Sequence, residues 1–88
     1  MSGRHEEHWI PVTTSSGMFS SEYAISLKLA DGRNVSFYVD KGLIRESGGH
    51  FLLRVVLVDN YPDQNKQRVL LPIETFETAT RWVEVPTK

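Results

Sequence analysis

The chain of 88 residues contains no cysteine. Disulfide bonds, thiolate metal ligands and a cysteine nucleophile are therefore excluded. No apolar run approaches the roughly 20 residues that a membrane-spanning helix needs. The first eight residues are polar and lack the apolar region of a signal peptide. We therefore expect a cytoplasmic protein that is not embedded in a membrane.

An excess of charge of one sign is also missing. Ten lysine and arginine residues stand against eleven aspartate and glutamate residues, which gives a formal net charge of −1. This balance disfavours a protein whose main task is to bind phosphate backbones. The hydrophobic fraction of 40% and the charged fraction of 24% are typical of a folded globular protein. We predict a single β domain over residues 9–88, because a chain of this length makes one domain.

No motif has the spacing of a known catalytic or metal-binding site. His5 and His8 are one residue short of the helical spacing that brings two imidazoles to a zinc ion. We interpret residues 1–8 as a flexible polar tail. Ser47 and His50 flank a Gly-Gly turn, which supplies neither an oriented base nor an oxyanion site. We expect no catalytic residue, no metal ion and no cofactor, and we predict that the protein is not an enzyme.

The stretch 23–39 predicts an antiparallel hairpin, because apolar and polar residues alternate on both sides of a turn. A two-residue loop at 31–32 would pair apolar residues with polar ones. A three-residue loop at 30–32 restores apolar pairs and puts Gly32 at the left-handed position of the turn, so we predict a positive φ there. This loop pairs Leu29 with Arg33, Leu27 with Val35, Ile25 with Phe37 and Tyr23 with Val39. These apolar residues should form the core face, and Ser26, Lys28, Ser36 and Tyr38 the opposite, scaffold-like face.

Three further segments are β-prone. Residues 9–13 contain Pro11, which cannot donate to a ladder, so we predict an edge strand or an extended arm there and a loop at 14–17. Residues 81–85 alternate and predict the last strand. Residues 67–73 also predict a strand. On this strand Val69, Leu71 and Ile73 should share one face, with Arg68 and Leu70 on the other.

Residues 51–58 are apolar on both faces except at Arg54. Such a run indicates a strand that is covered on both sides or that contributes to an assembly surface. One face would hold Leu53, Val55 and Leu57 against the core. The other face, with Leu52, Val56 and Val58, would then need the N-terminal arm or another chain to cover it.

The pattern as a whole predicts an all-β fold, a small antiparallel barrel or rolled sheet of five to six short strands. A one-turn helix is expected near 75–80, with Thr75 as its cap. A single helical turn before the last strand resembles the architecture of SH3-like barrels. This resemblance concerns architecture alone and implies no function.

We interpret the protein as a small non-catalytic interaction module or an oligomer-forming subunit, with a protein partner or a second copy bound on strands and loops after Gly49. The candidate interaction surface comprises Trp9, Arg54, Val56, Val58, Tyr61, Arg68, Arg81 and Trp82. The alternative is a small barrel that binds single-stranded nucleic acid through basic and aromatic side chains. The basic residues considered for it are Arg45, Arg54, Lys66, Arg68 and Arg81.

Overall fold

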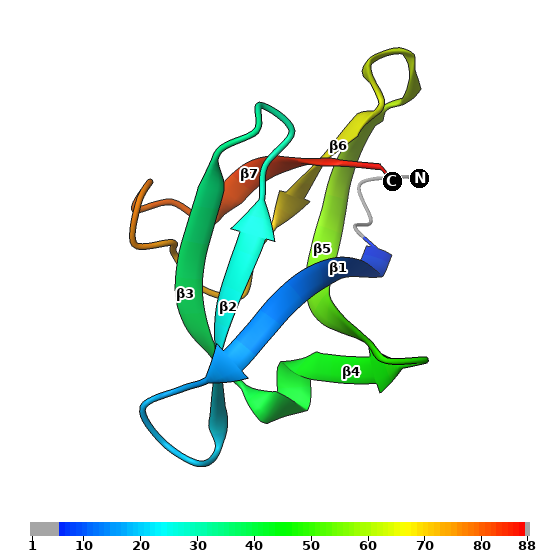
Figure 1. The fold of residues 1–88 in the computed structure, drawn as a ribbon. Coiled ribbons are helices and arrows are strands. Elements are labelled where there is room, and N and C mark those ends of the chain that lie inside the picture. Colours follow the sequence, from blue (N-terminus) through cyan, green and yellow to red (C-terminus); the bar gives the residue numbers. More distant parts are fainter. Residues whose placement is uncertain (1–5, 88) are drawn as a thin grey trace.

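The structure is a computed structural model that describes residues 6–87. Its strands are β1 (Glu6–Ser16), β2 (Glu22–Lys28), β3 (Asn34–Asp40), β4 (Ile44–Ser47), β5 (His50–Tyr61), β6 (Lys66–Leu70) and β7 (Trp82–Pro86). Two short 3-10 segments are η1 (Lys41–Leu43) and η2 (Pro62–Gln64). The strands form one curled antiparallel sheet in the order β3-β2-β1-β5-β6-β7, with β4 added beside β5 (Figure 1). This arrangement confirms the predicted all-β class and the rolled sheet. Within residues 6–87 no helix has the length and apolarity to cross a membrane.

The β2–β3 hairpin has the register that the sequence predicts. Tyr23 pairs with Val39 and Leu27 with Val35. The N–H of Gly32 donates to the carbonyl oxygen of Leu29 at 3.0 Å, and Gly32 has a φ of 92°. Glycine pays no steric cost in this left-handed conformation, which is why the three-residue loop forms here.

Strand β1 corrects two predictions from the sequence. The predicted loop at 14–17 is wrong as far as Ser16, because Thr13–Ser16 pair with β2. The predicted tail is wrong at residues 6–8, which open β1 and pair with Leu57, Val56 and Val55 of β5; residues 1–5 lie outside the described part of the chain. Backbone groups alone form the ladder, so polar side chains do not prevent pairing once a partner strand is present.

Pro11 lies inside β1, yet its missing N–H costs no ladder bond. Glu6–Val12 pair with β5, and pairing with β2 begins only at Thr13. Along β1 the backbone groups of alternate residues point to opposite edges, and Pro11 falls among those directed away from β5. The first half of β1, which contains Pro11, therefore pairs on one side alone, as an edge strand does, whereas the second half pairs with β2.

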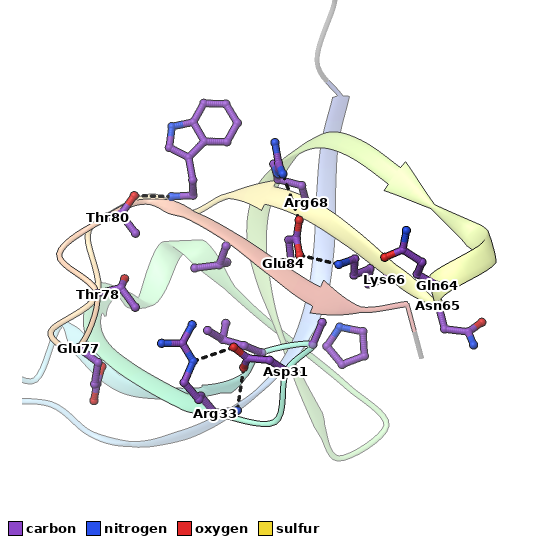
Figure 2. Close-up of a pocket in the computed structure, with 15 residues that line it drawn as sticks. Asp31, Arg33, Gln64, Asn65, Lys66, Arg68, Glu77, Thr78, Thr80 and Glu84 are labelled. Carbon is purple, nitrogen blue, oxygen red and sulfur yellow. Dashed lines mark hydrogen bonds and ion pairs between the residues drawn. The ribbon is translucent and has the colours of Figure 1, made fainter.

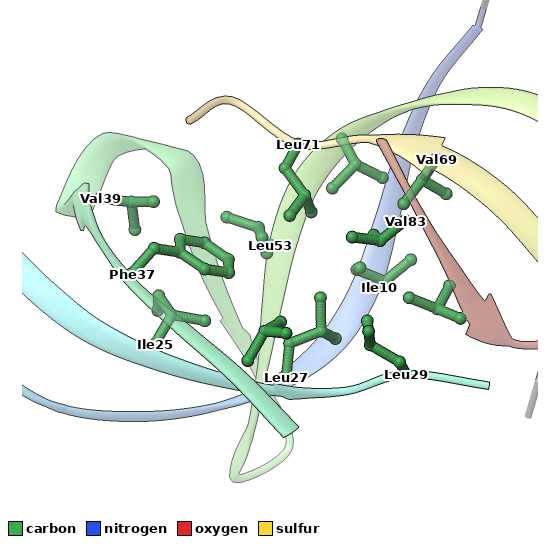
Figure 3. Packing of buried hydrophobic residues seen from close by; sticks show 13 residues of the cluster. Ile10, Ile25, Leu27, Leu29, Phe37, Val39, Leu53, Val69, Leu71 and Val83 are labelled. Atoms are coloured by element: carbon green, nitrogen blue, oxygen red, sulfur yellow. The ribbon is translucent and has the colours of Figure 1, made fainter. Parts of the chain in front are cut away.

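The concave side of the sheet encloses the hydrophobic core (Figure 3). Phe37 is 1% exposed, and Leu53, Val69 and Leu71 are fully buried. The remaining buried apolar residues are Ile10, Ile25, Leu27, Leu29, Val35, Val39, Val55, Val83 and Val85. The predicted placement of Ile73 with Val69 and Leu71 is wrong, because β6 ends at Leu70 and Ile73 is 46% exposed.

The edges of β3 and β7 approach each other without forming a ladder, so the sheet is a half-barrel. One hydrogen bond crosses this seam, from the N–H of Ala30 to the carbonyl oxygen of Glu84 at 2.8 Å. Beside it, the turn at 75–79 covers the edge of β3. Phe76 donates its N–H to the carbonyl of Ser36, and the Glu77 carboxylate accepts bonds from the N–H and hydroxyl of Ser36 at 2.7 and 2.6 Å.

The turn at 75–79 is the predicted helical turn, in its shortest form. The N–H of Thr78 donates to the hydroxyl of Thr75 at 3.0 Å, as the predicted cap requires. The N–H of Ala79 donates to the carbonyl of Thr75, closing a single turn. Ala79 has a φ of 54°, and this left-handed backbone conformation ends the turn.

Candidate interaction surface

Side-chain alternation along β1, β5, β6 and β7 creates an outer face, which we define as the side of these strands turned away from the core. Ile10, Leu53, Val69 and Val83 point inward and are buried. Their neighbours along each strand therefore point outward. The outer residues of the four strands form rows across the sheet, because pairing sets them opposite one another.

Most of the predicted interaction residues lie on this outer face. Trp9 is directly opposite Arg54 in the β1–β5 ladder. Val56 is opposite Leu70, which is itself opposite Trp82 in the β6–β7 ladder. One row therefore runs from Val56 through Leu70 to Trp82, and Trp82 remains 50% exposed at its end.

The remaining predicted residues lie at the margins of this face. Arg68 lies opposite Glu84, and Tyr61 closes the end of β5 with Arg68 near its ring. Arg81 precedes β7 and donates its Nε–H to the carbonyl of Leu71 at 2.8 Å. Val58 falls at the β-bulge between Leu57 and Asp59, outside the ladder and half-buried. The structure therefore groups seven of the eight predicted residues and separates Val58.

Basic side chains outnumber carboxylates on the outer face and its rim. The basic residues are Arg45, Arg54, Lys66, Arg68 and Arg81, and the carboxylates are Glu7, Asp59 and Glu84. Arg45 packs over the ring of Trp9 with 4.1 Å between its guanidinium carbon and the ring centroid. The whole chain has a net charge of −1, so the charged residues outside this set are acidic on balance.

Glu84 is the centre of an ion-pair cluster on the outer face. Its carboxylate contacts the ammonium of Lys66 at 2.9 Å and the guanidinium of Arg68 at 3.1 Å. Hydrogen bonds from Lys66 and Arg68 hold the pKa of Glu84 below its ordinary value, and the bond to Glu84 raises the pKa of Arg68. These groups are solvent-accessible, so the cluster fixes side-chain positions more than it stabilises the fold.

A groove of about 380 Å³ opens where the sheet is incomplete. Strand β4 pairs with β5 as far as Leu53, and β6 begins its pairing at Val56, so within the described part of the chain Arg54 and Val55 have no partner strand on that edge. Apolar side chains form the floor of the groove. They belong to the half-buried Leu43, Val56, Leu70 and Pro72, and the charged rim is made of Glu7, Arg54 and Arg81. Val55 and Leu71 also border the groove, but their side chains are buried in the core.

A larger groove of about 800 Å³ follows the seam beside β7 (Figure 2). Asp31 and Arg33 lie on one wall, and Lys66, Arg68 and Glu84 lie on the other. Backbone and side-chain hydrogen bonds from Arg33 hold the pKa of Asp31 below its ordinary value, and the hydroxyl and N–H of Ser36 do the same for Glu77.

The carboxylates of the seam groove are thus held in the ionised form by neighbours of the same chain. A general acid at neutral pH needs a raised pKa, and these shifts run in the opposite direction. Among residues 6–87, no three histidine, aspartate or glutamate side chains lie close enough together to hold a metal ion. His8 stands in β1 opposite Val55, and His5, the other histidine of the His-x-x-His spacing, lies outside the described residues.

Sequence reasoning did not place Leu43 and Pro72 on the interaction surface, since their meeting depends on where β4 and β6 stop. Leu70 offered a signal, because it is an apolar residue on the outward face of its strand. Fold and surface together define an all-β half-barrel domain with a basic, partly apolar outer face. No family model, no curated protein and no solved structure matches this chain.

Proposed function

We propose that the protein is a non-catalytic interaction module that binds another protein on its outer face. The observation that carries this proposal is the groove between β4 and β6, where an apolar floor lies within a charged rim. Protein interfaces combine a desolvated apolar centre with arginine and aromatic anchors. Arg54, Arg81 and the half-exposed Trp82 supply such anchors beside the groove.

The charge of the outer face favours a different, acidic partner over a second copy of this chain. An isologous dimer through this face would oppose its basic side chains to one another. An acidic surface would instead complement them and accelerate association. Self-association through the outer face is therefore the less favoured version of the same function.

The test compares two exposed aromatic residues. Trp82→Glu places a carboxylate on the outer face, and Phe19→Glu does the same in the β1–β2 loop, where Phe19 is 65% exposed. Partners captured from the native cell are mapped by cross-linking to the wild-type protein and both variants. We expect cross-links to outer-face residues that disappear in Trp82→Glu and persist in Phe19→Glu. Equal capture by both variants would contradict the proposal, and a wild-type dimer dissociated by Trp82→Glu in light scattering would replace it with self-association.

Single-stranded nucleic-acid binding is the second candidate, because five basic side chains share one surface with Trp9, Tyr61 and Trp82. The faces of two of these rings are partly occupied, since Arg45 lies over Trp9 and Lys66 and Arg68 lie near Tyr61. This candidate predicts salt-dependent binding of mixed-sequence oligonucleotides that weakens in Arg68→Ala and Arg81→Ala. The absence of a mobility shift at low salt would exclude it.

A further inference from the structure

We propose that the groove between β4 and β6 binds one apolar side chain from an extended partner segment whose neighbouring residues are acidic. In this arrangement Arg81 and Arg54 bind the carboxylates that flank the apolar side chain. The inference rests on the proposed protein-binding function and adds to it the chemistry of the partner.

The groove exists because two strands share one edge of β5 without meeting. Pairing with β4 reaches Leu53, and pairing with β6 starts at Val56. The two-residue turn before β5 makes Ser47 and His50 a hydrogen-bonded pair, so the N–H and C=O of His50 point toward β4. Backbone groups of every second residue point to the same edge of a strand, and those of Arg54 therefore point to this edge as well. A segment entering the gap therefore meets main-chain groups that no strand of the described chain pairs with.

The floor of the groove selects an aliphatic or aromatic side chain. It combines Val56 and Leu70 from the sheet with Leu43 and Pro72 from the segments that diverge at the gap. A volume of about 380 Å³ is near the lower limit of small-ligand pockets, so it suits one large side chain with its backbone. Among residues 6–87 no aromatic ring lines the groove, so the described chain offers a nucleotide base no stacking platform there.

The rim of the groove selects acidic neighbours. The one carboxylate that the described residues place on this rim is Glu7, which the guanidinium of Arg54 holds at 2.5 Å. Arg81 donates its Nε–H to the carbonyl oxygen of Leu71, and this hydrogen bond fixes the plane of the guanidinium. Among residues 6–87 no carboxylate forms an ion pair with Arg81. Its remaining N–H groups are thus oriented to donate to an incoming carboxylate, and the same rim repels a basic segment.

The test uses three blocked pentapeptides and isotope-labelled full-length protein. The first has the sequence Asp-Glu-Leu-Glu-Asp, the second replaces its acids with lysine, and the third replaces its leucine with glycine. Backbone amide shifts are followed by NMR during titration. We expect the first peptide to shift the amides of Arg54, Leu70 and Arg81, and we expect the other two to bind at least roughly tenfold more weakly.

Two variants assign the effect to the groove. Arg81→Gln should weaken binding of the acidic peptide at least roughly tenfold, whereas Arg33→Gln, in the exposed loop of the seam groove, should leave it unchanged. Thermal unfolding of both variants checks that the fold is intact. Equal affinity for the acidic and lysine peptides, or no shift at millimolar peptide, would overturn the inference. Displacement of the acidic peptide by an oligothymidine would do the same and would favour the nucleic-acid candidate.

The outcomes of the two experiments are separable. Loss of a native partner in Trp82→Glu, without any binding of the acidic peptide, would leave the protein-binding function standing and reject the groove chemistry. Capture that is insensitive to Trp82→Glu would reject the function itself.

Discussion

Phe37 and Phe76 offer a matched test of where the fold is held together, because the same substitution removes the same ring from two environments. Phe37 is 1% exposed and points into the core (Figure 3), whereas Phe76 is 65% exposed and contacts Tyr38 edge-to-face. Truncation of a buried phenylalanine costs about 3–5 kcal/mol. A domain of this size has a total stability of roughly 4–13 kcal/mol. Phe37→Ala should therefore remove a large share of the free energy of unfolding.

Phe76→Ala should cost far less. A fully enclosed phenylalanine buries roughly 200 Å² of surface. Phe76 is 65% exposed, so it buries only about a third of that area. At about 25 cal/mol per Å² this burial, together with the edge-to-face contact, amounts to about 1–2 kcal/mol at most. The backbone bond from Phe76 to Ser36 is unaffected by the substitution.

The assay is urea unfolding followed by circular dichroism, which does not depend on the half-exposed Trp82 as a reporter. We expect the free energies of unfolding of the two variants to differ by at least about 1 kcal/mol, with similar slopes against urea. Phe37→Leu should recover much of the loss, since it retains most of the buried volume. Equal destabilisation by Phe37→Ala and Phe76→Ala would refute the assignment of the core to the concave side of the sheet.

Three further outcomes are expected. Glu77→Gln should lower stability at neutral pH and lose its effect in acid. The pKa of Glu77 is lowered in the folded state, so its carboxylate stabilises the fold above the ordinary carboxylate pKa, and this stabilisation is lost as the pH falls through the lowered value. Unfolding curves measured in parallel that show the same difference from wild type at every pH would contradict the role of the bonds from Ser36. Gly32→Val should destabilise by about 1 kcal/mol or more and Gly32→Asn by less, since asparagine tolerates a φ of 92° better; equal thermal midpoints would contradict the loop geometry. Pro11→Ala should change the midpoint little and Val12→Pro should lower it strongly, because only the latter removes a bond to β5; the reverse order would show that the edges of β1 are wrongly assigned.

Local signals made the hairpin predictable. The alternation from Tyr23 to Val39 and the glycine at position 32 act within 17 consecutive residues, so pattern and turn chemistry together fix one register. The same reasoning found the strand after Gly49 and the turn capped by Thr75. It also placed Arg68 and Leu70 on the face of their strand opposite the buried Val69, because side chains alternate along a strand.

Nonlocal pairing decided the rest. The local sequence of residues 14–16 predicts a loop, and these residues become part of a strand because β2 presents its backbone to them. Ile73 continues an alternating pattern, yet the chain leaves the sheet after Leu70 and exposes it.

By itself, the amino-acid sequence determined the all-β class and the register of one hairpin, because these depend on neighbours along the chain. Only the tertiary structure decided that the sheet stays open between β3 and β7 and that β4 and β6 leave a gap at Arg54. Both features depend on where distant strands stop pairing. The groove at that gap, and with it the proposed binding chemistry, therefore belongs to the fold and to no single segment of the sequence.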